Sequence, residues 1–368
     1  MTFPLELSDP RSLGFAPAQL AKLDALIDGH IADGRYPGAQ VALARHGKLA
    51  YFRSYGNARL EPEQRPVGDD TLFLLFSNTK VLVSSAVWRL IEDGAVSLGD
   101  RIADFMPEFS VNDKADISLY DVMTHQGGFP GSNVSRASWN DHARMRADVC
   151  GFELEWPPGS RLQYHPRAAH YVLAMVIEAV TGRDYRKVVR TSIVEPLGLQ
   201  DELFLGVPAD QQSRCVDVRG EPVEEKNTPE FRTAGLPFGG SFGTARAQVT
   251  FYQMLLQEGR LNEQRILSPR MVAYLRRDLT GDRMDANQGV AMHRGLGPHL
   301  RGSPTHRSGL GYLAPPSTFG HGGIGSCYCW GDPDSGVSFA YLSNEVADPT
   351  WSSSRFDRVS NIVHASID

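Results

Sequence analysis

The sequence predicts an α/β (α+β) protein in which one sheet is built from both ends of the chain. Strand-like segments lie at 38–56 and 319–343, and helix-like segments lie between them. The 368 residues correspond to roughly two and a half domains of about 150 residues, and an inserted domain explains this surplus better than consecutive domains. We expect a sheet domain at 1–75 and 285–368, a mostly helical inserted domain at 76–284, and an active site in the cleft between them.

The first half of the chain begins with an amphipathic helix. It is expected over 17–34, where apolar residues recur at spacings of three and four. Two β-rich stretches then predict a hairpin that turns at His46-Gly47. A further helix is expected to begin near Ser77 and to end at Gly94, because glycine commonly follows a helix. Apolar residues cover most of its circumference, so this helix should be buried.

The second half alternates helices with long connections before strands return. Helices are expected at 168–182 and 246–259, each closed by a glycine. The polar, glycine- and proline-rich segments 126–150 and 205–240 are expected to be loops that form walls of a site. Strands are predicted around 319–330 and at 336–343, followed by a last helix. That helix carries four regularly spaced apolar residues, Phe356, Val359, Ile362 and Val363.

Composition excludes several classes of protein. The 37 Lys and Arg against 43 Asp and Glu give a net charge of −6, which lacks the basic excess of a nucleic-acid or anionic-membrane binder. Four cysteines without a CxxC pair and scattered histidines predict no metal site and no cofactor. No basic-then-apolar leader or long apolar run is visible. We expect a soluble, cytoplasmic monomer or small homo-oligomer that acts on a small molecule, without nucleic-acid or membrane partners.

Ser77 and Lys80 are the first candidates for chemistry. They stand three residues apart at the start of the expected buried helix, which places both side chains on one face. A serine hydroxyl becomes a good nucleophile when a base removes its proton, and a buried lysine with a lowered pKa is such a base. Lys80 is surrounded by apolar sequence, where a solvated lysine is costly. The backbone N–H groups at the start of a helix stabilise a developing oxyanion.

Two further segments carry candidates. Tyr164 precedes the 168–182 helix, and a phenol beside a cationic lysine is expected to have a lowered pKa and to shuttle protons. The glycine-rich run Gly320-His321-Gly322-Gly323-Ile324-Gly325 lies on or beside a predicted strand. Glycines there allow close approach of backbone and substrate. The N–H of Ile324 could complete an oxyanion hole with that of Ser77.

These three motifs, in this order, resemble the serine β-lactamase and penicillin-binding-protein superfamily. The nearest likeness is to its class-C-like branch, which includes family VIII carboxylesterases and related acyltransferases. The likeness covers nearly the whole chain and implies an antiparallel sheet flanked by helices. It is carried by the segments YPGAQVALARHGKLAYFRSYG, DDTLFLLFSNTK, ISLYDVMTHQGGFP, PPGSRLQYHPRAAHYVLAMVIEAVTG with VEPLGL, GGSFGTARAQVTFYQMLLQEG and FGHGGIGSCYCWGDPDSGVSFAYLSN.

The resemblance implies a role for each matching residue. Ser77 would be the acylated nucleophile, Lys80 its base or hydrogen-bond partner, and Tyr164 the second general base and acid. His321-Gly322-Gly323 stands where many relatives have Lys-Thr-Gly, and Ile324 would supply the second oxyanion donor. No metal or cofactor is implied.

Two departures from the family pattern affect the expected substrate. The family's Tyr-x-Asn is here Tyr164-His165-Pro166, so the asparagine amide that contacts an acylamino side chain is missing. His321 also replaces the lysine that neutralises a substrate carboxylate, and an imidazole is a poorer anchor than an ammonium group. Both departures favour uncharged esters of small or medium size over β-lactams and peptides.

A competing nucleophile is Ser241, in the run Gly239-Gly240-Ser241-Phe242-Gly243. This run fits G-x-S-x-G, the elbow of α/β-hydrolases, which requires a strand before the serine and a helix after it. A helix is expected to follow, but the preceding segment is polar and interrupted by proline. Asp332 and His364 would have to complete the triad. The S-x-x-K interpretation is preferred, and these glycines are expected to shape a loop at the border of the site.

The sequence therefore predicts a serine esterase that works through a Ser77 acyl-enzyme. Three alternatives remain open. The same scaffold could serve as a β-lactamase or D-amino-acid amidase or peptidase, or as an acyltransferase to an alcohol. A non-catalytic binding relative is disfavoured by the presence of Ser77, Lys80 and Tyr164.

Overall fold

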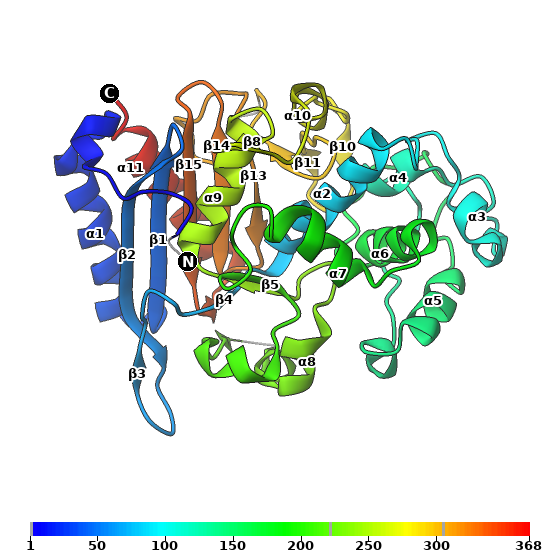
Figure 1. Ribbon diagram of the computed structural model, residues 1–368, viewed down its shortest axis with the longest axis horizontal. Coiled ribbons are helices and arrows are strands. Elements are labelled where there is room, and N and C mark those ends of the chain that lie inside the picture. Colours follow the sequence, from blue (N-terminus) through cyan, green and yellow to red (C-terminus); the bar gives the residue numbers. More distant parts are fainter. Residues whose placement is uncertain (1–2, 221–222, 304–305) are drawn as a thin grey trace.

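The computed structural model describes residues 3–220, 223–303 and 306–368. Its largest sheet has seven strands in the order β12-β13-β14-β15-β1-β2-β3, and every neighbouring pair is antiparallel. The fold class is therefore confirmed, with strands from both ends of the chain side by side (Figure 1). The strands are β1 (Gly38–Arg45), β2 (Lys48–Arg59), β3 (Arg65–Pro66), β12 (His299–Leu300), β13 (Phe319–Gly323), β14 (Cys327–Asp332) and β15 (Val337–Ser343).

The expected hairpin is present and its turn is as short as a hairpin allows. His46 and Gly47 connect β1 to β2 with φ values of 52° and 75°. Both values lie in the left-handed region that two-residue hairpin turns use. On its other side β1 pairs with β15, so that Ala39 lies opposite Ser343.

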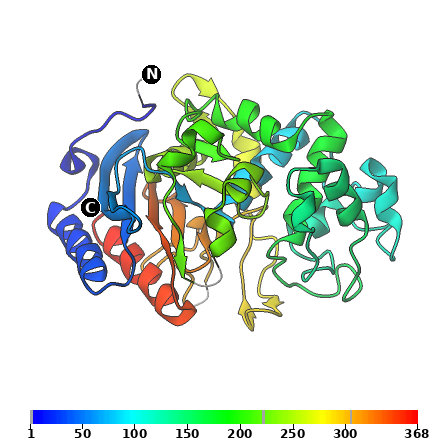
Figure 2. The ribbon, with the colours of Figure 1, turned by 90° about the horizontal axis from the view of Figure 1, so that it is seen from below.

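Two helices from the ends of the chain cover one face of the sheet. They are α1 (Pro17–Ala32) and α11 (Pro349–His364), which contact each other (Figure 2). Apolar side chains of both helices and of alternate strand positions form one buried cluster. Its members include Leu23, Ile27, Val41, Leu43, Phe339, Tyr341, Val359 and Val363.

The other face of the sheet is covered by α9 (Ala245–Leu256), which contacts β15, β1 and β14. The Gln253 amide on α9 is fully buried and donates to the Ala44 and Gly336 carbonyls and to Ser338 Oγ, all at 3.0 Å. This helix belongs to the range 76–284 that was expected to form the inserted domain, yet it packs on the sheet. The division of the chain into two domains stays a prediction.

The helical part lies beyond α9, with α2 packed against α6 (Figure 1). Among the described residues no helix is both long and apolar enough to cross a bilayer. The helices here and beside it are α2 (Thr79–Glu92), α3 (Ile102–Phe105), α4 (Leu119–Met123), α5 (His142–Cys150), α6 (Ala168–Thr181), α7 (Tyr185–Val189), α8 (Pro229–Ala234) and α10 (Pro269–Leu275).

The sequence predicts loops at 126–150 and 205–240, but each of these segments also contains a helix. The first ends in α5 and the second contains α8. In each case the side chain just before the helix accepts a backbone N–H of its first turn. Asp141 accepts from Arg144, and Thr228 accepts from Phe231. Such caps stabilise short helices even in polar sequence.

The remaining strands are short. They form a three-stranded sheet of β4 (Phe73–Leu74), β7 (Ser241–Gly243) and β5 (Leu203–Leu205), with β7 in the middle. Three further pairs are β6 (Arg219–Gly220) with β16 (Glu345–Val346), β8 (Arg260–Leu261) with β9 (Gln264–Arg265), and β10 (Met284–Asp285) with β11 (Val290–Ala291). The small three-stranded sheet matters because β4 leads directly into Ser77.

Candidate active site

Ser77 lies in a tight turn between β4 and α2. The turn is a 3₁₀ segment, Phe76–Asn78, which continues directly into α2 at Thr79, so the expected helix does begin near Ser77. Phe76 has φ 45°, a left-handed conformation that large side chains rarely adopt. Such strain costs on the order of 1–3 kcal/mol and persists only where packing enforces it. Here the Leu75 N–H also donates to the Ser241 carbonyl at 2.9 Å.

Lys80 is fully buried on the first turn of α2, as its apolar surroundings predicted. Its Nζ lies 2.9 Å from Ser77 Oγ and donates to the Phe238 carbonyl at 2.7 Å. Burial holds the pKa of the amine well below its usual range, and the charges of Arg294 and Arg167 lower the pKa further. The side chain is therefore prepared to act as an uncharged base beside the serine.

Tyr164 lies in the loop before α6, with Lys80 Nζ 5.3 Å from the centre of its ring. Burial raises the pKa of this phenol to about 12, while the Ser77 hydroxyl and Arg294 act in the opposite direction. The expectation of a lowered pKa is wrong, because the loss of solvent around the phenol outweighs the neighbouring positive charges. A phenol with this pKa keeps its proton at neutral pH and is therefore available as a proton donor.

Strand β13 packs directly against the turn Phe76–Asn78, which holds Ser77. A Cβ atom on Gly323 would lie 2.8 Å from Phe76 Cβ and 2.5 Å from Cys327 Sγ, so only glycine fits there. Ile324 follows, and its side chain is 63% exposed. This close passage brings the backbone of Ile324 to the neighbourhood of Ser77, where the second oxyanion donor was expected.

His321 is buried on β13 and burial lowers its pKa to about 3. Its Nδ1 lies 2.8 Å from the Gly322 carbonyl oxygen, which only accepts, so Nδ1 carries the proton. The lone pair is then on Nε2, which has no partner among the residues that the structure describes. His299 stacks nearby, with ring centres 4.0 Å apart, and burial keeps its pKa well below the usual range as well. Both imidazoles are therefore neutral.

Asp285 and Arg294 belong to the site but were not singled out from the sequence. Their side chains are 0% and 4% exposed, and Arg294 Nη2 donates to Asp285 Oδ2 at 2.9 Å. Asp285 also accepts the Tyr164 backbone N–H at 3.1 Å, and the Arg294 guanidinium lies 4.9 Å from the centre of the Tyr164 ring. Nothing in their spacing points to Tyr164, because the contact joins segments about 120 residues apart.

The predicted residues converge on one cavity of about 470 Å³. Lys80 lies beneath it, hydrogen-bonded to the serine that lines it. The arrangement places a serine hydroxyl, a buried amine and a protonated phenol around one open space, which are the groups that acyl transfer through a serine requires. The lining from the predicted set comprises Ser77, Tyr164, His321, Gly322, Gly323 and Ile324, joined by Arg294 and His299.

Ser241 has a different environment. It is fully buried in the middle strand β7, and its Oγ lies 2.6 Å from Thr79 Oγ1. Its backbone N–H also donates to Thr79 Oγ1 at 3.1 Å. No histidine or carboxylate contact is recorded for its hydroxyl within the described chain. Through these contacts with Thr79, Ser241 stabilises the start of α2.

Several buried histidines gather behind Tyr164. The His165 N–H donates to His125 Nδ1 at 3.2 Å, and His165 Nε2 accepts the Phe129 N–H at 3.1 Å. His125 and His170 have ring centres 6.3 Å apart. These contacts connect the Tyr164 loop to the segment after α4, so the cluster has a structural explanation.

A possible metal-ligand group lies elsewhere, although the sequence indicated none. His142, Glu178 and Asp184 place one donor atom each within 4.8 Å of one another. Their donor atoms are already engaged, because His142 Nδ1 lies 2.6 Å from Glu178 and Asp184 is paired with Arg186 at 2.6 Å. Ser77 does not belong to this group.

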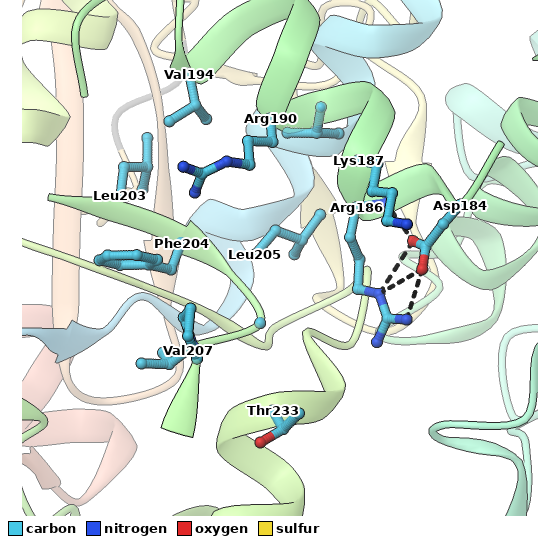
Figure 3. A pocket seen from close by; sticks show the side chains of 13 residues that line it. Asp184, Arg186, Lys187, Arg190, Val194, Leu203, Phe204, Leu205, Val207 and Thr233 are labelled. Carbon is cyan, nitrogen blue, oxygen red and sulfur yellow. Dashed lines mark hydrogen bonds and ion pairs between the residues drawn. The ribbon is translucent and has the colours of Figure 1, made fainter. Parts of the chain in front are cut away.

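A second cavity of about 480 Å³ is formed by α7, the turn after it and β5 (Figure 3). Arg186 is held by Asp184 there, and Arg190 pairs with Glu195 at 2.9 Å. Its described lining holds no serine, cysteine or histidine. The catalytic candidates therefore lie in the cavity at Ser77.

Comparisons with known proteins bear on the family and the fold. The family model described as Beta-lactamase matches residues 23–359. The protein named Esterase/beta-lactamase LipL, from Mycobacterium tuberculosis (strain ATCC 25618 / H37Rv), is 27% identical over 322 residues, which cover 77% of this chain and 72% of LipL.

Solved structures give the same fold. A penicillin-binding protein homologue from Caulobacter crescentus is 26% identical, with a TM-score of 0.82 over 96% of this chain and 99% of that chain. A family VIII carboxylesterase is 24% identical, with a TM-score of 0.82 over 94% of this chain and 97% of that chain. The named relatives thus include esterase, β-lactamase and penicillin-binding types.

Proposed function

Because the chain belongs to the Beta-lactamase family, whose model covers residues 23–359, we propose that it is a serine esterase for small or medium uncharged carboxylic esters. The observation that carries this proposal is the buried Lys80 amine, 2.9 Å from Ser77 Oγ. A lysine in this position with a lowered pKa supplies the base that a serine nucleophile requires.

In the first step Ser77 Oγ attacks the ester carbonyl carbon while its proton moves to Lys80 Nζ. The carbonyl oxygen becomes an oxyanion between the N–H groups of Ser77 and Ile324. Loss of one such donor typically costs about 10²–10³ in rate. The tetrahedral intermediate then collapses, and the bond to the alcohol oxygen breaks.

The alcohol leaves with a proton from the Tyr164 hydroxyl, which the raised pKa of about 12 keeps protonated. The proton on Lys80 then restores the phenol. Water attacks the acyl-enzyme carbonyl, its proton passes through the same pair of groups, and Ser77 Oγ is released as the hydroxyl. Each residue ends in the state in which it began.

The charges of the site favour a neutral substrate. Arg294 is paired with Asp285, His321 is neutral, and Lys80 is driven toward its uncharged form. Of these three groups only Arg294 carries a full charge, and its ion pair with Asp285 makes it a weaker anchor for a substrate carboxylate than a free lysine would be. The lone pair on His321 Nε2 would also repel that carboxylate, whereas a neutral ester does not incur this cost.

The test compares two serines. Ser77→Ala should abolish hydrolysis of p-nitrophenyl acetate and attachment of a fluorophosphonate label, detected by mass spectrometry of the intact protein. Ser241→Ala should retain most of both. Labelling that survives in Ser77→Ala and disappears in Ser241→Ala would overturn the assignment of the nucleophile. A folded wild-type protein that takes no label would favour a non-catalytic relative.

A second candidate is β-lactamase activity, which the name of LipL supports, and D-amino-acid amidase activity is tested beside it. Rates on nitrocefin, a D-alanyl amide and p-nitrophenyl acetate should separate the activities, with the ester hydrolysed fastest. Transfer to an alcohol would appear as a new ester when an acceptor alcohol is added. A cytoplasmic location belongs to the same proposal, and it is supported by four buried cysteines that are all free.

A further inference from the structure

A third, smaller cavity adjoins the cavity at Ser77. It measures about 340 Å³ and lies between the segment after β13 and the beginning of α11. The two cavities share four lining residues, so they meet along one wall rather than lying apart. The shared residues are Ile324, Gly325, Ser353 and Phe356.

The wall between the cavities is fixed by hydrogen bonds. Gly325 has φ 59°, and a Cβ atom on it would lie 2.6 Å from the Ala347 carbonyl oxygen. Its own carbonyl accepts from Arg355 Nη2 at 2.8 Å and from the Ala347 N–H at 3.2 Å. The backbone is thus held against α11, and the side chain of Ile324 remains 63% exposed where the two cavities meet.

The smaller cavity is suited to hydrocarbon. Its walls include the apolar side chains of Ile324, Val346, Pro349 and Phe356. The one carboxylate, Asp348, is engaged in capping α11, because it accepts the Trp351 N–H at 3.0 Å. An aliphatic chain that covers Ile324 removes apolar surface from water and is favoured by that burial.

The orientation of the ester follows from the proposed chemistry. Tyr164 lines only the larger cavity and must face the alcohol oxygen that it protonates. The carbonyl oxygen must face the Ile324 N–H. The acyl chain therefore leaves the carbonyl carbon on the side away from Tyr164, where the exposed Ile324 side chain and the smaller cavity can receive it.

We propose that the hollow between Ile324–Gly325 and the first turns of α11 is an acyl-chain arm that selects esters of medium-length aliphatic acids. This inference rests on the proposed esterase function. The arm gives the acyl chain an apolar site while the alcohol occupies the larger cavity.

The first experiment measures kcat/KM of the wild-type protein on p-nitrophenyl acetate, butyrate, hexanoate and octanoate. Each of the first methylenes added beyond acetate should raise kcat/KM by about fourfold until the arm is filled. A wild-type protein that hydrolyses acetate faster than butyrate and hexanoate would overturn the inference and leave the esterase proposal standing. No hydrolysis of any ester would overturn the esterase proposal itself.

The second experiment blocks the arm with Ser353→Phe, since Ser353 lines both cavities. The ratio of kcat/KM for hexanoate to that for acetate should fall by about tenfold or more. The matched control is Ser354→Phe, because Ser354 is the next residue on α11 and lines neither cavity. Its ratio should stay within about twofold of wild type. Thermal unfolding of both variants confirms that they are folded.

A third series varies the alcohol instead, with ethyl, butyl and hexyl acetates. Ser353→Phe should leave the order of these substrates as it is in the wild type. If Ser353→Phe changed alcohol selectivity and not acyl selectivity, the alcohol group rather than the acyl chain would occupy the arm, and the inference would be wrong. Equal ratios in Ser353→Phe, Ser354→Phe and wild type would also contradict it.

Discussion

Arg294 influences the pKa of two groups that would take part in the reaction. Its guanidinium lies 4.9 Å from the centre of the Tyr164 ring, and its charge lowers the pKa of both Lys80 and Tyr164. Burial disfavours the charged form of both groups, so it lowers the pKa of the Lys80 amine and raises the pKa of the Tyr164 phenol. Arg294 adds to the effect of burial at Lys80 and opposes it at Tyr164. It is a positioning residue that acts through its neighbours.

We predict that Arg294→Gln moves the ascending limb of the pH profile to higher pH. In the proposed mechanism the active form of Lys80 is uncharged, so kcat/KM should rise with pH through the pKa of this amine. Burial is the largest cause of the lowered pKa and remains, but loss of the Arg294 charge raises the pKa. The measurement is kcat/KM on p-nitrophenyl acetate from pH 5 to 10. Arg294→Lys keeps the charge and should keep the limb in place; an unmoved limb in Arg294→Gln would contradict the role.

Tyr164→Phe tests the proton donor. On benzyl acetate, whose alcohol leaves poorly without a proton, kcat should fall by about 10²–10⁴. On p-nitrophenyl acetate the loss should be clearly smaller, because p-nitrophenolate leaves without a proton. Comparison of the two substrates with one enzyme preparation makes misfolding irrelevant to the result. Equal losses on both esters would show that Tyr164 does not protonate the leaving group.

At the scale of elements, the contact between β13 and the turn that holds Ser77 determines the geometry of the site. A Cβ atom on Gly323 would meet Phe76 Cβ, Cys327 Sγ and the Leu75 carbonyl, all within 2.9 Å. Two of these atoms belong to the segment that holds Ser77, so the space cannot open without moving the nucleophile. The strand and the turn therefore act as one unit.

We predict that Gly323→Ala lowers kcat/KM by at least about 10², because the oxyanion donors move apart. Overpacking should also reduce the free energy of unfolding by about 1–3 kcal/mol. The control is Gly29→Ala on α1, where a Cβ atom meets nothing within 4 Å. Gly29→Ala should raise the free energy of unfolding by about 0.5–1 kcal/mol and leave kcat/KM unchanged. Urea unfolding and ester kinetics on both variants decide the matter.

Elements with a local signal could be predicted from the sequence. The hairpin at His46-Gly47 depends on two residues that tolerate positive φ, and the burial of Lys80 follows from its apolar neighbours. The Tyr164 loop could be located because α6 after it has an apolar pattern and ends at Gly182 in the left-handed conformation. Each of these signals is contained within about 20 residues.

Features that depend on long-range contacts could not be predicted. Arg294 and Asp285 reach Tyr164 from a segment without an amphipathic pattern, and their burial follows from packing across the cavity. The raised pKa of Tyr164 has the same origin, since the depth of its burial is a property of the whole site. Likewise, nothing within α9 shows that its buried face meets the sheet.

For the whole molecule, buried neutral histidines make stability depend on pH. Burial lowers the pKa of His165 to about 4 and that of His321 to about 3, and it keeps those of His125, His170 and His299 well below the usual range. An unfolded chain binds a proton on each of these residues near pH 6.5. Between pH 6.5 and 4 the unfolded state thus binds more protons than the folded state, so stability falls as the pH falls.

We predict that the free energy of unfolding decreases from pH 7 to pH 4.5, and that His165→Gln makes this decrease smaller. For His165 the full effect at and below pH 4 is on the order of 3 kcal/mol. The measurement is the urea midpoint and slope at several pH values. His46→Asn, in the exposed hairpin turn, should keep the pH dependence of the wild type. An identical pH dependence in His165→Gln would contradict the prediction.

The pairing of β1 with β15 has a consequence for the synthesis of the protein. Residues 38–45 must wait for residues 337–343 to leave the ribosome before β1 gains its second neighbour. Until then the hairpin has an open edge that could pair with another nascent chain. Ile324 is also translated late, so a chain arrested before β13 would carry Ser77 and Lys80 without the second oxyanion donor. Ester hydrolysis would therefore require that translation has passed Ile324. A chaperone that shields the edge of β1 until β15 is available should raise the yield of active enzyme.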